Sequence, residues 1–175
     1  VNDLLEFVRS RLGSSLPIEP KAMDLALACQ AALDEACAGQ PDCAPTLHVE
    51  GDVQGQWDPR RLGQMLQNLI GNALQHGARR GKVTLTLSGD ADEVTLRVHN
   101  LGQPIAEDAI ATLFDPLVRS PSEDISQPGT STSLGLGLFI IKEVVDAHKG
   151  SIDVTSTEAE GTTFTVVLPR NAWAL

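Results

Sequence analysis

Apolar residues recur along this chain at two spacings, and each spacing predicts one kind of element. Spacings of three and four residues predict helices. These lie over 3–12, from 23 to about 39, over 58–76, over 105–114, and in the apolar stretch that follows the glycine pair at 135 and 137. Strict alternation of apolar and polar residues predicts strands. These lie over 46–51, in the two runs of a hairpin within 82–100, and over 150–157 and 161–169.

Two local signals set boundaries in this pattern. Asp58-Pro59 predicts a helix start, because aspartate caps a helix through its side chain and proline is tolerated at the first helical position. Residues 115–134 have no periodicity and are rich in Pro, Ser and Thr. A polar loop of this length inside a compact domain is typical of a lid or a binding loop.

The order of the elements predicts the fold class. A helix and a strand are followed by a helix, two strands, a short helix, the long loop, a helix and two strands. This order favours an α+β fold, a two-layer sandwich in which about three helices cover a mixed five-stranded sheet. We expect a linker with two prolines over residues 14–22 and one domain over 23–170.

Composition narrows the partners of this domain. The formal net charge of −10 argues against a nucleic-acid partner and against direct contact with an anionic membrane. No stretch approaches the roughly 20 apolar residues that span a bilayer. The first thirteen residues carry charges throughout, so they do not form a signal peptide. We expect this domain to be cytoplasmic, and we expect the full-length protein that contains it to be either soluble or anchored to a membrane.

The three cysteines predict no metal site. Cys29, Cys37 and Cys43 are odd in number and form no Cys-x-x-Cys pair, and no His/Cys cluster has the spacing of zinc ligands. We therefore expect reduced, partly buried thiols in a reducing compartment.

Asn68 and Asn72 form the first candidate site. They are four residues apart, so they lie on the same side of the 58–76 helix, beside its apolar stripe. Asparagine is a poor residue for a helix interior. The two side chains are either solvated amides or a neutral oxygen pair that helps to hold Mg²⁺ with the phosphates of a nucleotide.

Three glycine-containing segments form the other candidates. Asn100-Leu101-Gly102 is either an ordinary turn or a turn whose asparagine reads the edge of a base. Residues 134–138 (LGLGL) open a helix, whose free N–H groups suit phosphate. The segment 161–164 (GTTF) indicates by itself only the start of a strand. A P-loop is excluded, because the chain has no G-x-x-x-x-G-K-S/T pattern.

Taken together in this order, the motifs resemble the GHKL superfamily and, within it, the histidine kinase catalytic domain. QMLQNLIGNALQHG resembles the N box, NLGQPI the first glycine box, and LFDPL the F box. LGLGLFIIKEVVDAHKGSIDV and EGTTFTVVLP resemble the last two motifs. The resemblance runs from about Asp24 to Pro169. Residues 1–13 resemble the end of the dimerisation and phosphotransfer helices that precede this domain.

The resemblance implies a Bergerat fold that binds ATP and Mg²⁺, with residues 115–134 as the ATP lid. It implies Asn72 as the metal ligand and Asn68 as its support, and both as catalytic. The other implied ATP-binding residues are Gln75, His76, Asn100, Gly102, Pro104, Ile105, Phe114, Arg119, Leu134, Gly135, Leu136, Gly137, Leu138, Thr162 and Thr163. The implied partners are the helical domain that carries the phosphoacceptor histidine and the receiver domain of a response regulator.

Three positions depart from the family pattern. Asn100 replaces the aspartate that reads adenine, Pro104 replaces a glycine, and Gln75 replaces a common lysine. The uncharged Asn100 predicts weaker ATP binding, because hydrogen bonds to charged groups are the stronger ones. The alternative is a degenerate, non-catalytic module that acts through protein contacts.

Asn68 and the histidines bear on the reaction. Hydrolytic relatives of the gyrase and MutL kind carry a glutamate where this chain has Asn68, and an amide cannot serve as a general base. We therefore expect ATP to be kept for transfer to a histidine. None of His48, His76, His99 and His148 has the helical His-Asp/Glu pattern of a phosphoacceptor. We expect the acceptor to lie on a separate domain.

Overall fold

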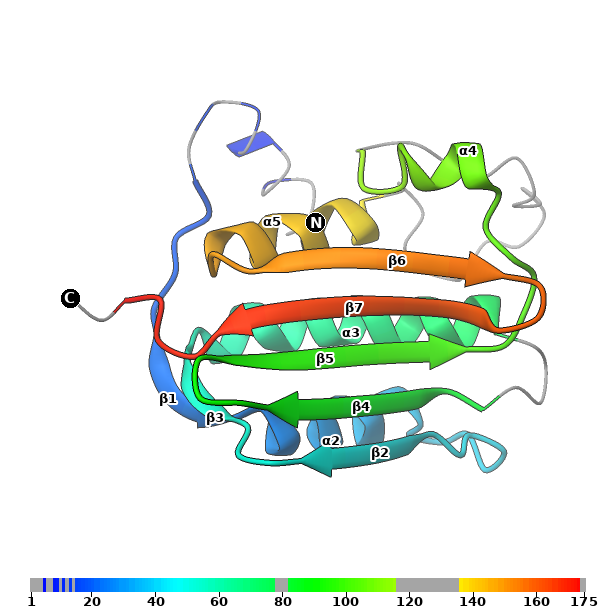
Figure 1. Cartoon of the computed structure of the whole chain (residues 1–175), viewed down its shortest axis with the longest axis horizontal. Helices are drawn as coiled ribbons and strands as arrows, with labels where there is room; N and C mark the ends of the chain where they lie inside the picture. Colours follow the sequence, from blue (N-terminus) through cyan, green and yellow to red (C-terminus); the bar gives the residue numbers. More distant parts are fainter. Residues whose placement is uncertain are drawn as a thin grey trace.

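The computed structural model describes residues 15–77, 82–115 and 136–173, together with residues 5, 8, 9, 11 and 13. A five-stranded sheet has the order β2-β4-β5-β7-β6 and three helices on one face (Figure 1). The strands of this sheet are β2 (Thr46–Glu50), β4 (Thr84–Gly89), β5 (Glu93–Asn100), β6 (Ser151–Thr157) and β7 (Gly161–Pro169). The helices are α2 (Leu25–Ala36), α3 (Pro59–His76) and α5 (Gly137–Ala147). The predicted α+β sandwich is confirmed.

The sheet is mixed, as predicted. β2 runs parallel to β4, whereas the pairs β4–β5, β5–β7 and β6–β7 are antiparallel. Alternation places the apolar residues of each strand on the face that the helices cover. On β5 and β7 the buried apolar residues are Val94, Leu96, Val98, Phe164, Val166 and Leu168. Burying each of these side chains contributes roughly 1.5–3 kcal/mol.

Helix α3 is the central helix, with α5 on one side of it and α2 on the other (Figure 1). It begins as its sequence predicts, because the carboxylate of Asp58 accepts hydrogen bonds from the N–H groups of Arg60 at 3.0 Å and Arg61 at 3.2 Å. Its buried stripe includes Leu62, Met65, Leu66, Leu69, Ile70 and Ala73. The apolar stripe therefore fixes how α3 is rotated against the sheet.

His148 ties the end of α5 to the start of α3. Its Nε2 atom accepts a hydrogen bond from the N–H of Asp58 at 3.1 Å, so Nδ1 carries the proton and donates to the carbonyl of Val144 at 2.7 Å. The side chain is fully buried, and this burial lowers its pKa below the ordinary value. These contacts give His148 a structural role.

A second, two-stranded sheet was not predicted. β1 (Lys21–Asp24) pairs antiparallel with β3 (Gln54–Trp57), so the expected linker at 14–22 runs into a strand and α2 begins at Leu25. Each strand has only four residues and shows no clear alternation, so its partner decides its conformation. The predicted helix over 105–114 is also shorter than expected, with α4 limited to Glu107–Ile110.

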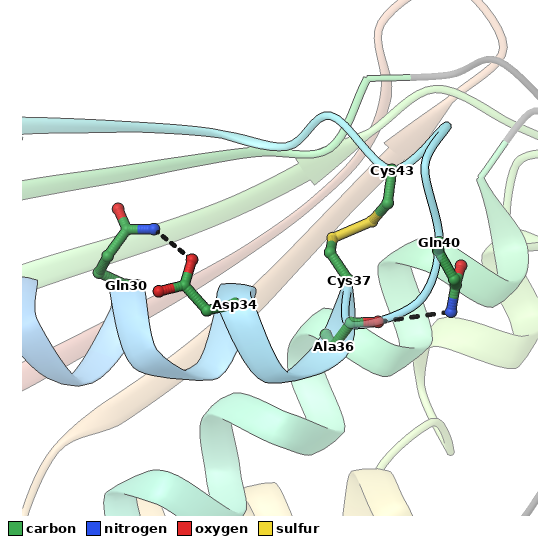
Figure 2. Close-up of a disulfide and its surroundings, with 6 residues drawn as sticks. All are labelled: Gln30, Asp34, Ala36, Cys37, Gln40 and Cys43. Carbon is green, nitrogen blue, oxygen red and sulfur yellow. Dashed lines mark hydrogen bonds between the residues drawn. A yellow bond between two sulfur atoms is a disulfide. The ribbon is translucent and has the colours of Figure 1, made fainter.

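The prediction of three reduced thiols is wrong for two of them. Cys37 and Cys43 form a disulfide whose Cα atoms are 5.5 Å apart (Figure 2). Successive turns fold the chain back after α2, because the N–H of Gln40 bonds to the carbonyl of Cys37 and that of Cys43 to the carbonyl of Gln40. Cys29 is free and buried as expected, and burial, aided by the charge of Asp24, raises its pKa to about 12. None of the helices in the described ranges is long and apolar enough to cross a membrane.

Candidate functional site

Three polar side chains form a row across one end of the sheet. Asn100 ends β5, is paired in register with Thr162 of β7, and Thr162 is paired with Ser156 of β6. Asn100 and Thr162 continue the buried faces of their strands beyond the last apolar residues, Val98 and Phe164. They are only 4% and 6% exposed. This polar row, Asn100, Thr162 and Ser156, therefore lies at the edge of the apolar core.

Hydrogen bonds join the polar row to the turn that follows β5. Ser156 Oγ accepts a hydrogen bond from the N–H of Ile105 at 2.8 Å and lies 2.7 Å from Thr162 Oγ1. Gly102, earlier in the same turn, forms an antiparallel bridge with Gly77 at the end of α3. The turn is thus held between β6 and α3.

Two glycines allow this close packing of backbone segments. A Cβ atom on Gly77 would lie 2.7 Å from the carbonyl oxygen of Ala73, and one on Gly161 would lie 2.4 Å from that of Asn100. Gly161 also has a φ of +79°, in the left-handed region that glycine adopts without strain. The segment 161–164 is therefore more than a strand start, because its glycine lets β7 approach the Asn100 turn.

The amide pair Asn68 and Asn72 lies on the flank of α3 that faces away from α2. Gln67 donates to Glu35 of α2 at 2.9 Å and so marks the flank next to α2. At about 100° per residue, Asn68 and Asn72 lie about 100° and 140° further round the helix. Both are half-buried, and α5 packs on this other flank. The expectation that they sit beside the apolar stripe agrees with this placement.

The ends of several helices and strands meet at the end of the sheet that bears the polar row. The carboxyl ends of α3, β5 and β6, the start of β7, the short helix α4 and the amino end of α5 all gather at the right-hand end of the view in Figure 1. Among the described residues, no group of three or more His, Cys, Asp or Glu side chains could hold a metal ion.

The sequence of residues 57–172 matches the profile of one family, described as the histidine kinase-, DNA gyrase B- and HSP90-like ATPases. The chain belongs to this family. The resemblance drawn from the five motifs is confirmed, and this ATPase domain is of the kind found in sensor histidine kinases.

Curated relatives of this ATPase domain include sensor histidine kinases. Sensor histidine kinase ZraS of Escherichia coli K12 is 38% identical over 116 residues, which are 66% of this chain and 23% of ZraS. CusS of Escherichia coli O157:H7 is 34% identical over 97% of this chain and 34% of its own length. A bacteriophytochrome of Pseudomonas aeruginosa is 30% identical over 97% of this chain and 23% of its own length. The chain thus spans about a quarter to a third of these relatives.

Solved structures share the fold of this ATPase domain. The mycobacterial sensor histidine kinase MprB is 25% identical, with a TM-score of 0.71 over 86% of this chain and 97% of the MprB chain. The catalytic domain of histidine kinase ThkA, at 24% identity, has a TM-score of 0.69 over 87% of this chain and 96% of its own. The ThkA likeness shows the fold alone.

The structure brings most of the predicted ATP-binding residues of this ATPase domain to the same end of the sheet. Ile105 and Phe114 are partly buried against the core, and the Phe114 ring meets that of Phe164 edge-on at 6.4 Å between centroids. Leu136 is buried at the start of α5. Gly137 and Leu138 are half-buried, whereas Gln75, His76 and Pro104 are exposed. Arg119, Leu134, Gly135 and most of the predicted lid lie outside the described residues.

Thr163 is not brought together with the others. It alternates with the buried Thr162 and Phe164 on β7, so its side chain points to the opposite face of the sheet. There its register partners are His99 and Thr155. A contact of Thr163 with a ligand on the helix-covered face would have to come from its backbone.

Ser156 was not among the site residues predicted from the sequence. It lies eight residues before Phe164, in a stretch that looks like an ordinary strand end. Its signal was the alternation of half-buried Ile152, Val154 and Ser156 on one face of β6, where a hydroxyl takes the place of the next apolar side chain. Its partners on the turn and on β7 are visible only in the structure.

Proposed function

We propose that this domain binds ATP with Mg²⁺ and holds the γ-phosphate for transfer to a histidine on a separate helical domain of the same kinase. The observation that carries the proposal is the juxtaposition of the buried polar row with the end of the helix that bears the amide pair. In the whole kinase the phosphoryl group would pass on to the receiver domain of a response regulator. This site would act in the cytoplasm.

The polar row provides the base-binding end of the proposed site. Asn100 and Thr162 are buried polar groups at the edge of an apolar core, where the flat face of a purine can pack on side chains such as Ile105. The amide oxygen of Asn100 accepts a hydrogen bond from the exocyclic amine of adenine. Gly102 and Gly77 keep the backbone close at this point.

The amide pair provides the phosphate end. Mg²⁺ prefers few protein ligands and keeps phosphate and water oxygens, so the neutral donor set of Asn72, with Asn68 beside it, fits a nucleotide-bound Mg²⁺. Bound there, Mg²⁺ would offset the charge of the phosphates. The N–H groups of Leu136, Gly137 and Leu138 at the start of α5 have no partner within the helix and suit the phosphate oxygens, aided by the helix dipole. The other predicted contacts with the nucleotide are Gln75, His76, Gly135, Leu134, Thr163, Phe114, Pro104 and Arg119.

The composition of α3 supports transfer rather than hydrolysis. Between Pro59 and His76 the helix has no aspartate or glutamate, so it offers no carboxylate that could take a proton from water. This chain would therefore contribute to catalysis by positioning the nucleotide. Positioning is a general means of catalysing phosphoryl transfer.

The histidines of the chain support an acceptor elsewhere. Both ring nitrogens of the buried His148 are hydrogen-bonded. His99 Nε2 lies 2.7 Å from the carbonyl oxygen of Glu160, and His48 lies on the edge strand β2. His76, the last residue of α3, is exposed, but a glycine follows it instead of the Asp or Glu of the phosphoacceptor pattern. These arrangements favour an acceptor on a separate domain.

Calorimetric titration of the chain with ATP, with and without Mg²⁺, tests the proposal. We expect Mg²⁺-dependent binding that weakens at least about tenfold in Asn72→Ala, since a metal ligand is lost. Gln67→Ala is the matched control, because it removes an amide from the other flank of α3 and should leave the affinity unchanged. Equal affinities for the two variants would contradict the assignment of Asn72.

The departures at Gln75, Asn100 and Pro104 favour a second candidate, a degenerate module that acts through protein contacts. Two of these positions, Gln75 and Pro104, are exposed and free to form a contact surface. The same titration separates the two candidates. Absence of binding at millimolar ATP would favour the degenerate module.

A further inference from the structure

The base-binding end of the proposed site contains two buried groups that can each donate or accept a hydrogen bond. Asn100 carries an amide oxygen and an amide NH₂, and Thr162 carries a hydroxyl. They are 4% and 6% exposed, and they are register partners on β5 and β7. A ligand bound at this end of the site would meet both groups away from water.

The surroundings of Asn100 and Thr162 do not hold either group as only a donor or only an acceptor of hydrogen bonds. The one hydrogen bond found for the Asn100 side chain among the described residues is a long one, from Nδ2 to the carbonyl oxygen of Leu101 at 3.5 Å. At that distance the bond is weak, and it does not prevent the amide from turning over. The amide can therefore present either its oxygen or its NH₂ group to a ligand.

The hydroxyl of Thr162 is equally reversible. It lies 2.7 Å from Ser156 Oγ, and either oxygen can be the donor. Ser156 Oγ already accepts from the N–H of Ile105 at 2.8 Å, which leaves its own proton free to point to Thr162 or away from it. When Ser156 donates, Thr162 is free to donate to a ligand, and when Thr162 donates to Ser156, its oxygen is free to accept.

The purine bases differ in which atoms of their edge donate and which accept hydrogen bonds. Adenine has a donor at position 6 and an acceptor at N1, whereas hypoxanthine and guanine have an acceptor at position 6 and a donor at N1. A carboxylate at position 100 could only accept, so it would oppose a 6-oxo group. The amide of Asn100 can turn over to pair with either kind of base, and the hydroxyl of Thr162 can change from donor to acceptor with it.

We propose that this site discriminates only weakly between 6-amino and 6-oxo purine nucleoside triphosphates. In this scheme Asn100 sets the specificity, and Ser156 acts as a positioning residue that lets Thr162 change polarity. The inference rests on the proposed nucleotide-binding function and adds the substrate class of that site.

Calorimetric titrations of the full chain with ATP, ITP and GTP in the presence of Mg²⁺ test the inference. ITP differs from ATP in its 6-oxo group and its N1 proton but lacks the 2-amino group of GTP, so it isolates the polarity of the base edge. We expect ITP to bind within about fivefold of ATP. In Asn100→Asp we expect the preference for ATP over ITP to rise by roughly ten- to a hundredfold, which corresponds to one opposed buried hydrogen bond.

A second pair of variants keeps the test independent of how well Asn100→Asp folds. Thr162→Val removes the reversible hydroxyl at nearly constant volume, so it should weaken ATP and ITP by similar factors and leave their ratio unchanged. Thr165→Val is the matched control, because Thr165 alternates with the buried Phe164 and Val166 on β7 and its side chain points to the opposite face of the sheet. Selective loss of ATP binding in Thr162→Val would contradict a hydroxyl that serves both bases.

The outcomes separate this inference from the function on which it rests. If ATP binds and ITP is more than about thirtyfold weaker, the inference is wrong and the ATP site stands. An unchanged ATP-to-ITP ratio in a folded Asn100→Asp variant would also overturn it. If no nucleotide binds with Mg²⁺, the proposed function fails and the inference fails with it.

Discussion

Removing the carboxylate of Asp58 should destabilise the domain more than removing an ordinary helix cap. One oxygen of Asp58 caps α3 through the N–H groups of Arg60 and Arg61. The other oxygen accepts a hydrogen bond from the N–H of Glu19 at 2.9 Å. One buried side chain thus fixes both the start of the helix that bears the amide pair and the segment that precedes β1. Asp58→Ala breaks both links.

The structure gives the size of the effect. Loss of an N-cap typically costs about 1 kcal/mol of unfolding free energy. The bond to Glu19 adds about 1.5–3 kcal/mol, because a charged carboxylate accepts it. We therefore expect Asp58→Ala to lose about 2.5–4 kcal/mol, or about 5–16 °C in melting temperature for a chain of this size. Asp24 caps α2 with one bond, from the N–H of Ala26 at 2.8 Å, so Asp24→Ala should lose only about 1 kcal/mol.

The pH dependence of Asp58 gives a second check. Burial alone would raise its pKa, but the N–H groups of Glu19, Arg61 and Arg60 and the charge of Arg60 outweigh burial, and the pKa is lowered. Because the folded chain holds the proton less tightly than the unfolded chain, the stabilisation is present above the ordinary pKa of about 3.9. It is lost as the pH falls through the folded pKa, so the deficit of Asp58→Ala should shrink in acid.

Urea denaturation followed by circular dichroism measures these differences, and hydrogen exchange of the Glu19 amide reports the second link directly. Asp58→Asn separates the two roles, because its oxygen can still cap α3 while its NH₂ group opposes the N–H of Glu19. We expect its stability to lie between those of the native chain and Asp58→Ala. If Asp58→Ala loses no more than Asp24→Ala, the reasoning is refuted.

Three further outcomes are expected. Reducing the disulfide between Cys37 and Cys43 should lower the unfolding free energy by about 2 kcal/mol, as expected for a short closed loop, and a Cys37→Ser variant in urea should show no further effect of reductant. Because the pKa of His148 is lowered, the unfolded chain binds more protons, and stability should fall as the pH drops below about 6.5; His148→Gln should lack that part of the slope in denaturation measured from pH 8 to 5. Asn68→Glu should increase ATP hydrolysis in a phosphate-release assay, since it places a carboxylate beside the proposed metal site, and an unchanged rate would count against the role given to the amide.

The sequence determined those features that depend on local pattern. Alternation in β5 and β7 and the three- and four-residue spacing in α3 report which side chains are buried, and burial alone is enough to predict the five strands and the three covering helices. Asp58-Pro59 fixed the start of α3 because capping involves only neighbouring residues. The order of five motifs identified the family. These predictions needed no knowledge of which distant segments meet.

Tertiary structure alone decided the features that depend on contacts between distant residues. The bond between Ser156 and Ile105 joins residues 51 apart, and that between Glu19 and Asp58 joins residues 39 apart. The pairing of β1 with β3 stabilises two strands too short to have a signature of their own. The turns after α2 brought Cys37 to Cys43. Periodicity reports how deeply a residue is buried, but the identity of its neighbour is set only when the whole chain has packed.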